Sequence, residues 1–270
     1  MILARRRSVS LARRRSGVRL LNPSLVINGT AVTPAFRVRG GDANGTNWPY
    51  WGYGGTAPTL QAGTAPSYNQ GSVFTGIDDD SVDFNGGGYY KGGDTTTGDV
   101  ATEDFAFEAV VKVGAASKYF AAKLLNVTTY QGWVVGVPAG GTSIVLTVQK
   151  ADGAGCTASS PAVTAGQLIH IFAACNRDET VSNGMVVCVD GVAGATAATL
   201  SETLSSAREL HLGTFSYDPA TYVYGTNVYY VALWKQANWL AAGAGGMTEI
   251  ASIAASRFAA LTGRVPGSWT

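Results

Sequence analysis

The chain has 270 residues, of which 46% are hydrophobic and only 14% charged, and it contains 35 glycines and 27 aromatic residues (12 Tyr, 9 Phe and 6 Trp). This composition is too apolar for a disordered chain, and no stretch reaches the ~18 consecutive apolar residues of a membrane span. The net charge of +1 hides an asymmetry. Residues 1–40 hold nine arginines and no acidic residue, whereas the other 230 residues carry ten Lys and Arg against 18 Asp and Glu. Such a division predicts a basic arm that seeks an acidic partner.

Residues 1–20 form the basic arm, in which Arg-Arg-Arg-Ser occurs twice, eight residues apart. The crowded guanidinium groups repel one another, so we expect the arm to stay extended until an anionic partner neutralises it. That partner could be the carboxylate-rich surface of a neighbouring subunit or nucleic acid bound without sequence specificity. The alternative is a solvated, disordered terminus. The partner-binding candidates in the arm are Arg5, Arg6, Arg7, Arg13, Arg14 and Arg15.

Residues 21–75 are rich in turn-forming residues and contain four clustered aromatic residues, Trp48, Tyr50, Trp51 and Tyr53. These rings could cover one end of a β-sandwich, anchor a protein interface or stack on sugar rings, and we favour the roles in that order. Among them, Trp48 and Trp51 are our candidates for contact with a partner. The sequence leaves open whether this segment is a separate domain or wraps around the domain that follows.

Residues 76–240 contain short runs in which apolar and polar residues alternate, which is typical of half-buried β-strands. In the first clear run, one face is predicted to carry Phe105, Phe107, Ala109, Val111 and Val113, and the other Glu108, Val110 and Lys112. Further runs of strand length occupy residues 133–137, 143–149, 167–174, 185–190 and 227–234. Residues 176–184 are predicted to join two strands as a hairpin, and Asp190-Gly191 favours the next tight turn. Successive antiparallel runs with no helix between them predict an all-β sandwich.

Residues 241–270 are expected to form a Gly/Ala linker and a short C-terminal helix. Thr248 is the predicted N-cap, with Glu249 in the first turn, and Gly263 and Pro266 are predicted to end the helix. Its apolar face would consist of Ile250, Ile253, Ala254, Phe258 and Leu261. We expect this face to pack on the chain's own sandwich rather than on a partner.

Several of these runs resemble, in the right order, the strand motifs of laminin-G-like, concanavalin A-like jelly-roll domains. The segments that carry the resemblance are Ser81–Tyr90 (SVDFNGGGYY), Asp104–Lys112 (DFAFEAVVK), Gln167–Ala174 (QLIHIFAA), Val186–Gly191 (VVCVDG), Leu210–Gly213 (LHLG) and Asn227–Trp234 (NVYYVALW). The resemblance covers residues 82–234 and implies an antiparallel jelly-roll β-sandwich. Members include lectins, glycan hydrolases and structural modules, so the fold alone does not give the function.

Catalytic and metal-binding patterns are absent or incomplete in the sequence. Hydrolases with this fold carry carboxylates as Glu-x-Asp-x-x-Glu, whereas in residues 103–108 the aspartate falls on the opposite strand face. We therefore interpret Glu108 as a solvent-facing strand residue and the chain as non-enzymatic, with no catalytic residue. The three aspartates at 78–80, with Asp83, could bind calcium, but contiguous carboxylates favour a solvated turn. Three scattered cysteines and two distant histidines argue against a zinc site, so neither a metal nor a cofactor is expected.

The Arg-rich start followed by a Gly/Ala-rich, weakly charged sandwich is similar in style to accessory structural proteins of tailed bacteriophages. This resemblance implies a virion location and a capsid decoration, cement or other accessory subunit, attached through its arm to other capsid or tail proteins. Few charges and many aromatic residues fit a subunit that buries much surface on assembly, and a homo-oligomer is expected on general grounds. The alternative is a glycan-binding, receptor-binding tail fibre or spike protein. We expect no membrane partner and no specific nucleic acid.

Overall fold

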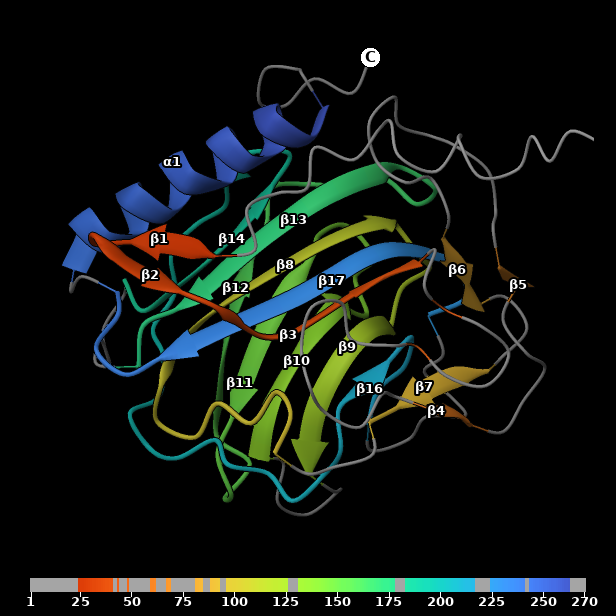
Figure 1. The fold of residues 1–270 in the computed structure, drawn as a ribbon, viewed down its shortest axis with the longest axis horizontal. Coiled ribbons are helices and arrows are strands. Elements are labelled where there is room, and N and C mark those ends of the chain that lie inside the picture. Colours follow the sequence, from red (N-terminus) through yellow and green to blue (C-terminus); the bar gives the residue numbers. More distant parts are fainter. Residues whose placement is uncertain are drawn as a thin grey trace, which may run out of the picture.

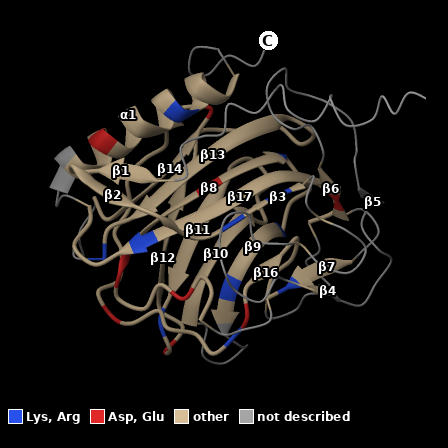
Figure 2. Ribbon diagram, viewed as in Figure 1, with Lys and Arg blue, Asp and Glu red and all other residues tan. Residues whose placement is uncertain are grey.

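In the residues that the structure describes, the chain forms an antiparallel jelly-roll β-sandwich of two large sheets, with one helix packed on the outside (Figure 1). The computed structural model describes residues 24–40, 43, 48, 59–61, 67–68, 81–84, 88–92, 96–125, 131–177, 183–216, 224–240 and 243–262. The predicted basic arm lies outside the described residues. Figure 2 shows that charged residues are sparse on the strands and more frequent in the loops at one end of the sandwich.

Within the described ranges the first sheet has eight strands, in the order β15-β14-β13-β8-β17-β6-β5, with β3 paired to β17 as well. These strands are β3 (Pro34–Arg39), β5 (Ser67–Tyr68), β6 (Val82–Asp83), β8 (Asp104–Lys112), β13 (Leu168–Cys175), β14 (Met185–Val189), β15 (Val192–Ala193) and β17 (Asn227–Gln236). Cys175 pairs with Met185 across β13 and β14, which confirms the predicted hairpin. Asp190 and Gly191 have φ of 53° and 77°, the paired positive values of a tight hairpin turn, before β15.

The second sheet has seven strands in the described part of the chain, in the order β12-β11-β10-β9-β16-β7-β4. Their bounds are β4 (Thr59–Gln61), β7 (Tyr89–Lys91), β9 (Lys118–Leu125), β10 (Gln131–Val137), β11 (Val145–Gln149), β12 (Gly155–Ser159) and β16 (His211–Leu212). Strands β3, β4 and β5 come from the turn-rich part of the sequence, and each pairs with a strand of the sandwich. These described strands therefore extend the two sheets.

The main core lies between the two sheets, and the predicted alternation along β8 is confirmed there. Phe105, Phe107 and Val111 point into this core, where Phe107 meets the ring of Trp133 at a centroid distance of 5.9 Å. The indole of Trp133 also donates a hydrogen bond to the carbonyl oxygen of Gly98 at 2.8 Å, so its polar atom is satisfied inside the core.

A second apolar core lies on the other face of the eight-stranded sheet, beneath α1 (Gly243–Thr262) and the hairpin of β1 (Leu25–Ile27) and β2 (Thr30–Val32) (Figure 1). Helix residues Ile250, Ala254 and Phe258 are fully buried, which confirms that the helix packs on its own sandwich. Both faces of this sheet are thus covered, as in a three-layered structure. Buried apolar side chains on each face stabilise the layers by about 1.5–3 kcal/mol apiece.

The predicted start of the helix is wrong by about one and a half turns. Thr248 is not the N-cap and Glu249 is not in the first turn, because α1 begins at Gly243. Met247 is only 4% exposed and packs in the second core, which holds the Gly-rich start of the helix against the sheet. Glu249 instead accepts a hydrogen bond at 2.8 Å from the backbone N–H of Asn28, in the β1–β2 turn. No helix among the described residues is long and apolar enough to cross a membrane.

Candidate functional site

Of the predicted partner-binding residues, only Trp48 lies in the described part of the chain. The six arginines of the arm and Trp51 lie outside it, as do Tyr50 and Tyr53. Trp48 is fully buried: its indole N–H donates to the carbonyl oxygen of Arg39 at 2.6 Å, and its ring lies 5.4 Å from that of Tyr90. The expected partner contact of Trp48 is therefore corrected, because a buried indole is out of reach. Trp48 instead packs in the main core between the two sheets.

The carboxylates closest to a hydrolase pattern are held in structural contacts. Asp104 is buried, and its carboxylate accepts hydrogen bonds from the backbone N–H groups of Arg177 at 2.6 Å and Trp239 at 2.7 Å. Its neighbour Glu103 is paired with the ammonium group of Lys235 at 2.6 Å. Asp104 thus joins three separate segments of chain, and charge-assisted hydrogen bonds of this kind are the strong ones.

Glu108 is not a solvent-facing residue, contrary to the sequence-based expectation. It is fully buried beneath α1, where the Nε and Nη2 atoms of Arg257 donate to its two carboxylate oxygens at 2.7 Å each. The Nε2 atom of His170 lies 2.9 Å from Oε1 of the same carboxylate. Burial acts to raise the pKa of Glu108, but the charge and hydrogen bonds of Arg257, with those of His170, outweigh it and lower the pKa to about 2. We call Glu108, His170 and Arg257 the helix clamp.

The helix clamp is built to hold the helix and not to meet a substrate. The guanidinium of Arg257 lies 5.2 Å from the ring centre of Trp234 on β17, a cation–π distance. Tyr230, also on β17, has a pKa raised well above 10 by burial and by the negative charge of Glu108. His170 and Glu108 have side chains 1% and 0% exposed, so no ligand reaches them in this arrangement.

A different group of polar and aromatic side chains lies on the outer face of the seven-stranded sheet, the face opposite the main core. Tyr90 and Leu212 point into the core, so strand alternation places Tyr89, Lys91 and His211 on the outer face. The rings of Tyr89 and His211 are stacked, with centroids 5.4 Å apart and planes 23° from parallel.

Beside these stacked rings, the ammonium group of Lys91 lies 3.0 Å from the carboxylate of Glu209, and both side chains are partly exposed. We call Tyr89, Lys91, Glu209 and His211 the sheet-face patch. Tyr89 and Lys91 lie on β7, His211 lies on β16, and Glu209 lies two residues before β16. The two strands are about 120 positions apart in the sequence and are joined by strand pairing.

His211 is the unusual member of the sheet-face patch. It is 3% exposed, and neither ring nitrogen has a hydrogen-bond partner among the residues that the structure describes. Burial lowers its pKa to about 4, against the opposing effect of Glu209, so the imidazole is neutral at pH 7. A neutral imidazole has one donor and one acceptor. Buried polar atoms without partners are rare and call for a ligand, a water or a functional role.

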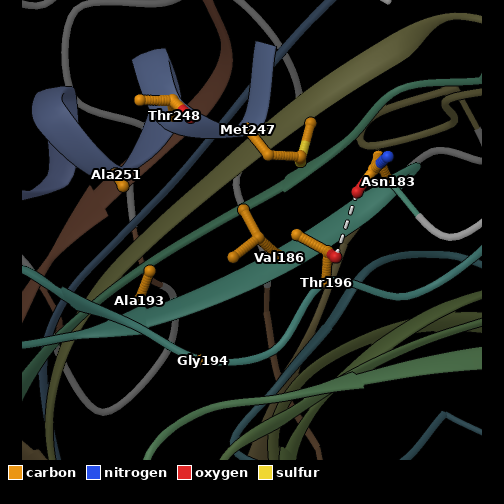
Figure 3. A pocket seen from close by; sticks show the side chains of 8 residues that line it. All are labelled: Asn183, Val186, Ala193, Gly194, Thr196, Met247, Thr248 and Ala251. Atoms are coloured by element: carbon orange, nitrogen blue, oxygen red, sulfur yellow. Dashed lines mark hydrogen bonds between the residues drawn. The ribbon is translucent and has the colours of Figure 1, made fainter. Parts of the chain in front are cut away.

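A small pocket of about 290 Å³ lies where α1 meets the edge of the eight-stranded sheet (Figure 3). Met247 and Ala251 of the helix form one wall, and Val186 of β14 lies opposite. The hydroxyl of Thr196 donates to the side-chain oxygen of Asn183 at 3.2 Å on the rim. The lining has no charged and no aromatic side chain, so it offers neither an ionic contact nor a stacking surface.

The described residues contain neither a group of metal ligands nor a reactive buried thiol. Within the ranges that the structure describes, no three His, Cys, Asp or Glu side chains are grouped as metal ligands. The aspartates at 78–80 lie outside those ranges. Cys175 and Cys188 are buried, and burial raises the pKa of their thiols to about 11 and about 12. Such thiols are protonated and unreactive at neutral pH.

No family model matches the chain, and no curated protein matches its sequence. Among solved structures, domain 4 of AbnA, a GH43 extracellular arabinanase from Geobacillus stearothermophilus in complex with arabinotriose, is similar with a TM-score of 0.55 at 11% identity, over 83% of this chain and 98% of that one. A Trypanosoma rangeli sialidase in complex with 2,3-difluorosialic acid is similar with a TM-score of 0.52 at 14% identity, over 84% of this chain. The likeness spans 33% of the sialidase chain. At these identities the two structures share the fold with this chain.

Proposed function

We propose that this chain is a glycan-binding β-sandwich module, and that the sheet-face patch is where the glycan binds. The observation that carries the proposal is the partly exposed Tyr89 beside the partly exposed Lys91–Glu209 ion pair, with the buried ring of His211 stacked against Tyr89 as its support. Further support comes from the shared fold with an arabinanase domain whose structure contains arabinotriose, because the likeness covers 98% of that domain.

The chemistry of the patch matches what a sugar ring offers. The face of a tyrosine ring gives an apolar platform for the C–H face of a sugar and keeps a polar group at its end. The ammonium group of Lys91 supplies donors and the carboxylate of Glu209 supplies acceptors, so adjacent hydroxyl groups can bond to both. Binding sites of this kind combine an apolar surface with a few convergent polar groups.

We propose that the role is binding without catalysis. Glu103, Asp104 and Glu108 are each engaged in contacts that hold the sandwich together. Glycoside hydrolysis requires two carboxyl groups on opposite sides of the scissile bond, and these three carboxylates are committed elsewhere.

The test is a glycan array probed with the full chain, followed by calorimetry with arabinotriose and with any glycan that the array identifies. We expect Tyr89→Ala to weaken binding at least tenfold, because it removes the stacking surface, and Tyr89→Phe, which keeps the ring, to weaken it less than threefold. Val26→Ala is the matched control, since Val26 is exposed on the β1–β2 hairpin, far from this sheet. An array without a bound glycan refutes the function, and equal binding by Tyr89→Ala refutes the site.

The concentration of arginine in residues 1–40 favours a second candidate, a virion accessory subunit such as a capsid decoration protein that attaches through its basic arm. The two candidates are compatible in a receptor-binding tail fibre or spike. Deletion of residues 1–20 tests the attachment: loss of the protein from particles supports it, and unchanged incorporation contradicts it.

A further inference from the structure

The charges around the sheet-face patch are unbalanced, and this imbalance bears on which glycans the patch accepts. The inference rests on the proposed function. Among the described residues, the cations of Lys91, Arg208 and Lys123 act on the imidazole of His211, against the single carboxylate of Glu209. His211 itself is neutral near pH 7, because burial lowers its pKa to about 4. Three positive charges against one negative charge leave the described surroundings of the patch with a net positive charge.

Two of these three cations already have partners. The ammonium group of Lys91 lies 3.0 Å from the carboxylate of Glu209, and the two side chains are 33% and 26% exposed. Lys123 is buried, and its ammonium group donates to the carbonyl oxygen of Arg208 at 2.5 Å. Because a buried charge is screened only weakly, Lys123 adds to the positive potential of the patch without offering a donor to a ligand.

Arg208 is the cation that remains. It is half-buried and directly precedes Glu209. Its backbone is engaged, since the N–H donates to the hydroxyl of Ser206 at 3.2 Å and the carbonyl oxygen accepts from Lys123. Its guanidinium forms no hydrogen bond or ion pair with any residue that the structure describes. A guanidinium offers five N–H donors in a planar fork that matches a carboxylate, so the patch has an unused group for an anion at its border.

We propose that the sheet-face patch, with Arg208 at its border, binds acidic sugars in preference to neutral ones. The ring of Tyr89 supports one face of the sugar, and the hydroxyl groups bond to the Lys91–Glu209 pair. The carboxylate of the sugar forms a bidentate pair with Arg208. Glu209 keeps Lys91 as its own cation, so each anion is paired and the excess of positive charge falls. Complementary charges of this kind set the specificity between related ligands.

The sharpest test uses matched pairs of oligosaccharides that differ only in oxidation at C6: galactotriose with trigalacturonic acid, and cellotriose with the corresponding triglucuronic acid. The glycan identified on the array, with its uronic counterpart, forms the third pair. Dissociation constants are measured by calorimetry on the full chain in about 0.3 M NaCl, where the exposed charges of the basic arm are largely screened. We expect the acidic member of each bound pair to bind at least fivefold more tightly.

Three variants separate Arg208 from the other cations of the chain. Arg208→Gln removes the fork and its charge, and we expect it to lower the preference for the acid at least fivefold. Arg208→Lys keeps the charge but cannot form the bidentate pair, so its preference should lie between those of the wild type and Arg208→Gln. Lys112→Gln is the matched control, because it removes one exposed cation from the end of β8 in the other sheet; it should leave the preference unchanged.

The outcomes distinguish this inference from the proposed function. Neutral members that bind as tightly as acidic ones overturn the preference and leave glycan binding intact. A preference that persists in Arg208→Gln overturns the role of Arg208, and one that falls equally in Lys112→Gln shows a general effect of charge, including that of the basic arm, and overturns it as well. Binding to no glycan, neutral or acidic, overturns both the inference and the proposed function.

Discussion

Replacement of Arg257 by methionine should destabilise the sandwich strongly, and by an amount that depends on pH. Methionine preserves much of the side-chain volume but leaves the fully buried carboxylate of Glu108 without its bidentate partner. Removal of one partner of a buried ion pair costs about 3–5 kcal/mol. The pKa of Glu108 gives a second route to this free energy. In the folded wild type it is lowered from 4.5 to about 2, which at 1.36 kcal/mol per pH unit corresponds to roughly 3 kcal/mol of stabilisation of the ionised carboxylate.

The sign of the pH dependence separates this explanation from a simple loss of packing. In the wild type, Glu108 binds its proton more weakly in the folded state than in the unfolded state, so its contribution is present above about pH 4.5 and is lost as the pH falls toward 2. In Arg257→Met, only His170 still opposes the effect of burial, so the pKa of Glu108 rises relative to the wild type. The variant should therefore lose stability as the pH rises above about 4.5, and the difference from the wild type should shrink at pH 4.

Urea denaturation followed by tryptophan fluorescence, at pH 4 and pH 7, measures both effects. Glu103→Gln is the matched control, because it breaks the partly exposed pair with Lys235 and should cost less than about 1 kcal/mol. Glu108→Leu combined with Arg257→Met removes both charges and should recover most of the loss. The reasoning fails if Arg257→Met costs less than 1 kcal/mol at pH 7, or if its cost is the same at both pH values.

Two further predictions concern a glycine of the backbone and the reactivity of the thiols. Gly213→Ala should lower the free energy of unfolding by more than about 2 kcal/mol, because φ is +84° and the new Cβ would lie 2.2 Å from the ring of Phe84. Gly166 has a similar φ of +82° but open space around it, so Gly166→Ala should cost only about 1 kcal/mol, and equal thermal shifts in the two variants would contradict the packing argument. With a thiol-specific reagent at pH 8, Cys156 should react first, because Cys175 is buried in the main core and Cys188 in the second core. Prompt reaction of all three thiols in the native protein would show that both cores open readily.

The strands of the sandwich could be predicted from the sequence because their signal is local. In β8, each second residue from Phe105 to Val113 enters the main core, and the alternating pattern records this directly. The same local pattern gave the wrong environment for Glu108, because it cannot show that a helix about 150 positions later covers the other face. The sequence contained one indication of this burial. Arg257 follows Ala254 by three positions and so falls on the apolar side of the helix, and a cation buried there requires a buried anion as its partner.

The sheet-face patch had no comparable signal. Tyr89 and Lys91 belong to a three-residue strand and His211 to a two-residue strand, and neither run is long enough to show its period. Their proximity depends on the pairing of β7 with β16, which is a property of the topology. For Trp48, an aromatic residue in a turn-rich segment gave no indication of depth. Its burial follows from the arrangement of Phe84 and Tyr90 around it.

The position of β17 has a consequence for how the chain acquires its structure. This strand pairs with β8 along one edge and with β3 and β6 along the other. Before residues 227–236 have left the ribosome, the strands of the eight-stranded sheet form three unjoined parts, β15-β14-β13-β8, β6-β5 and β3, each with an unpaired edge. Contacts between residues so distant in the sequence form slowly, and comparable β-proteins fold in about milliseconds to seconds. The nascent chain therefore spends most of its synthesis with open strand edges, in need of protection from pairing with neighbouring chains.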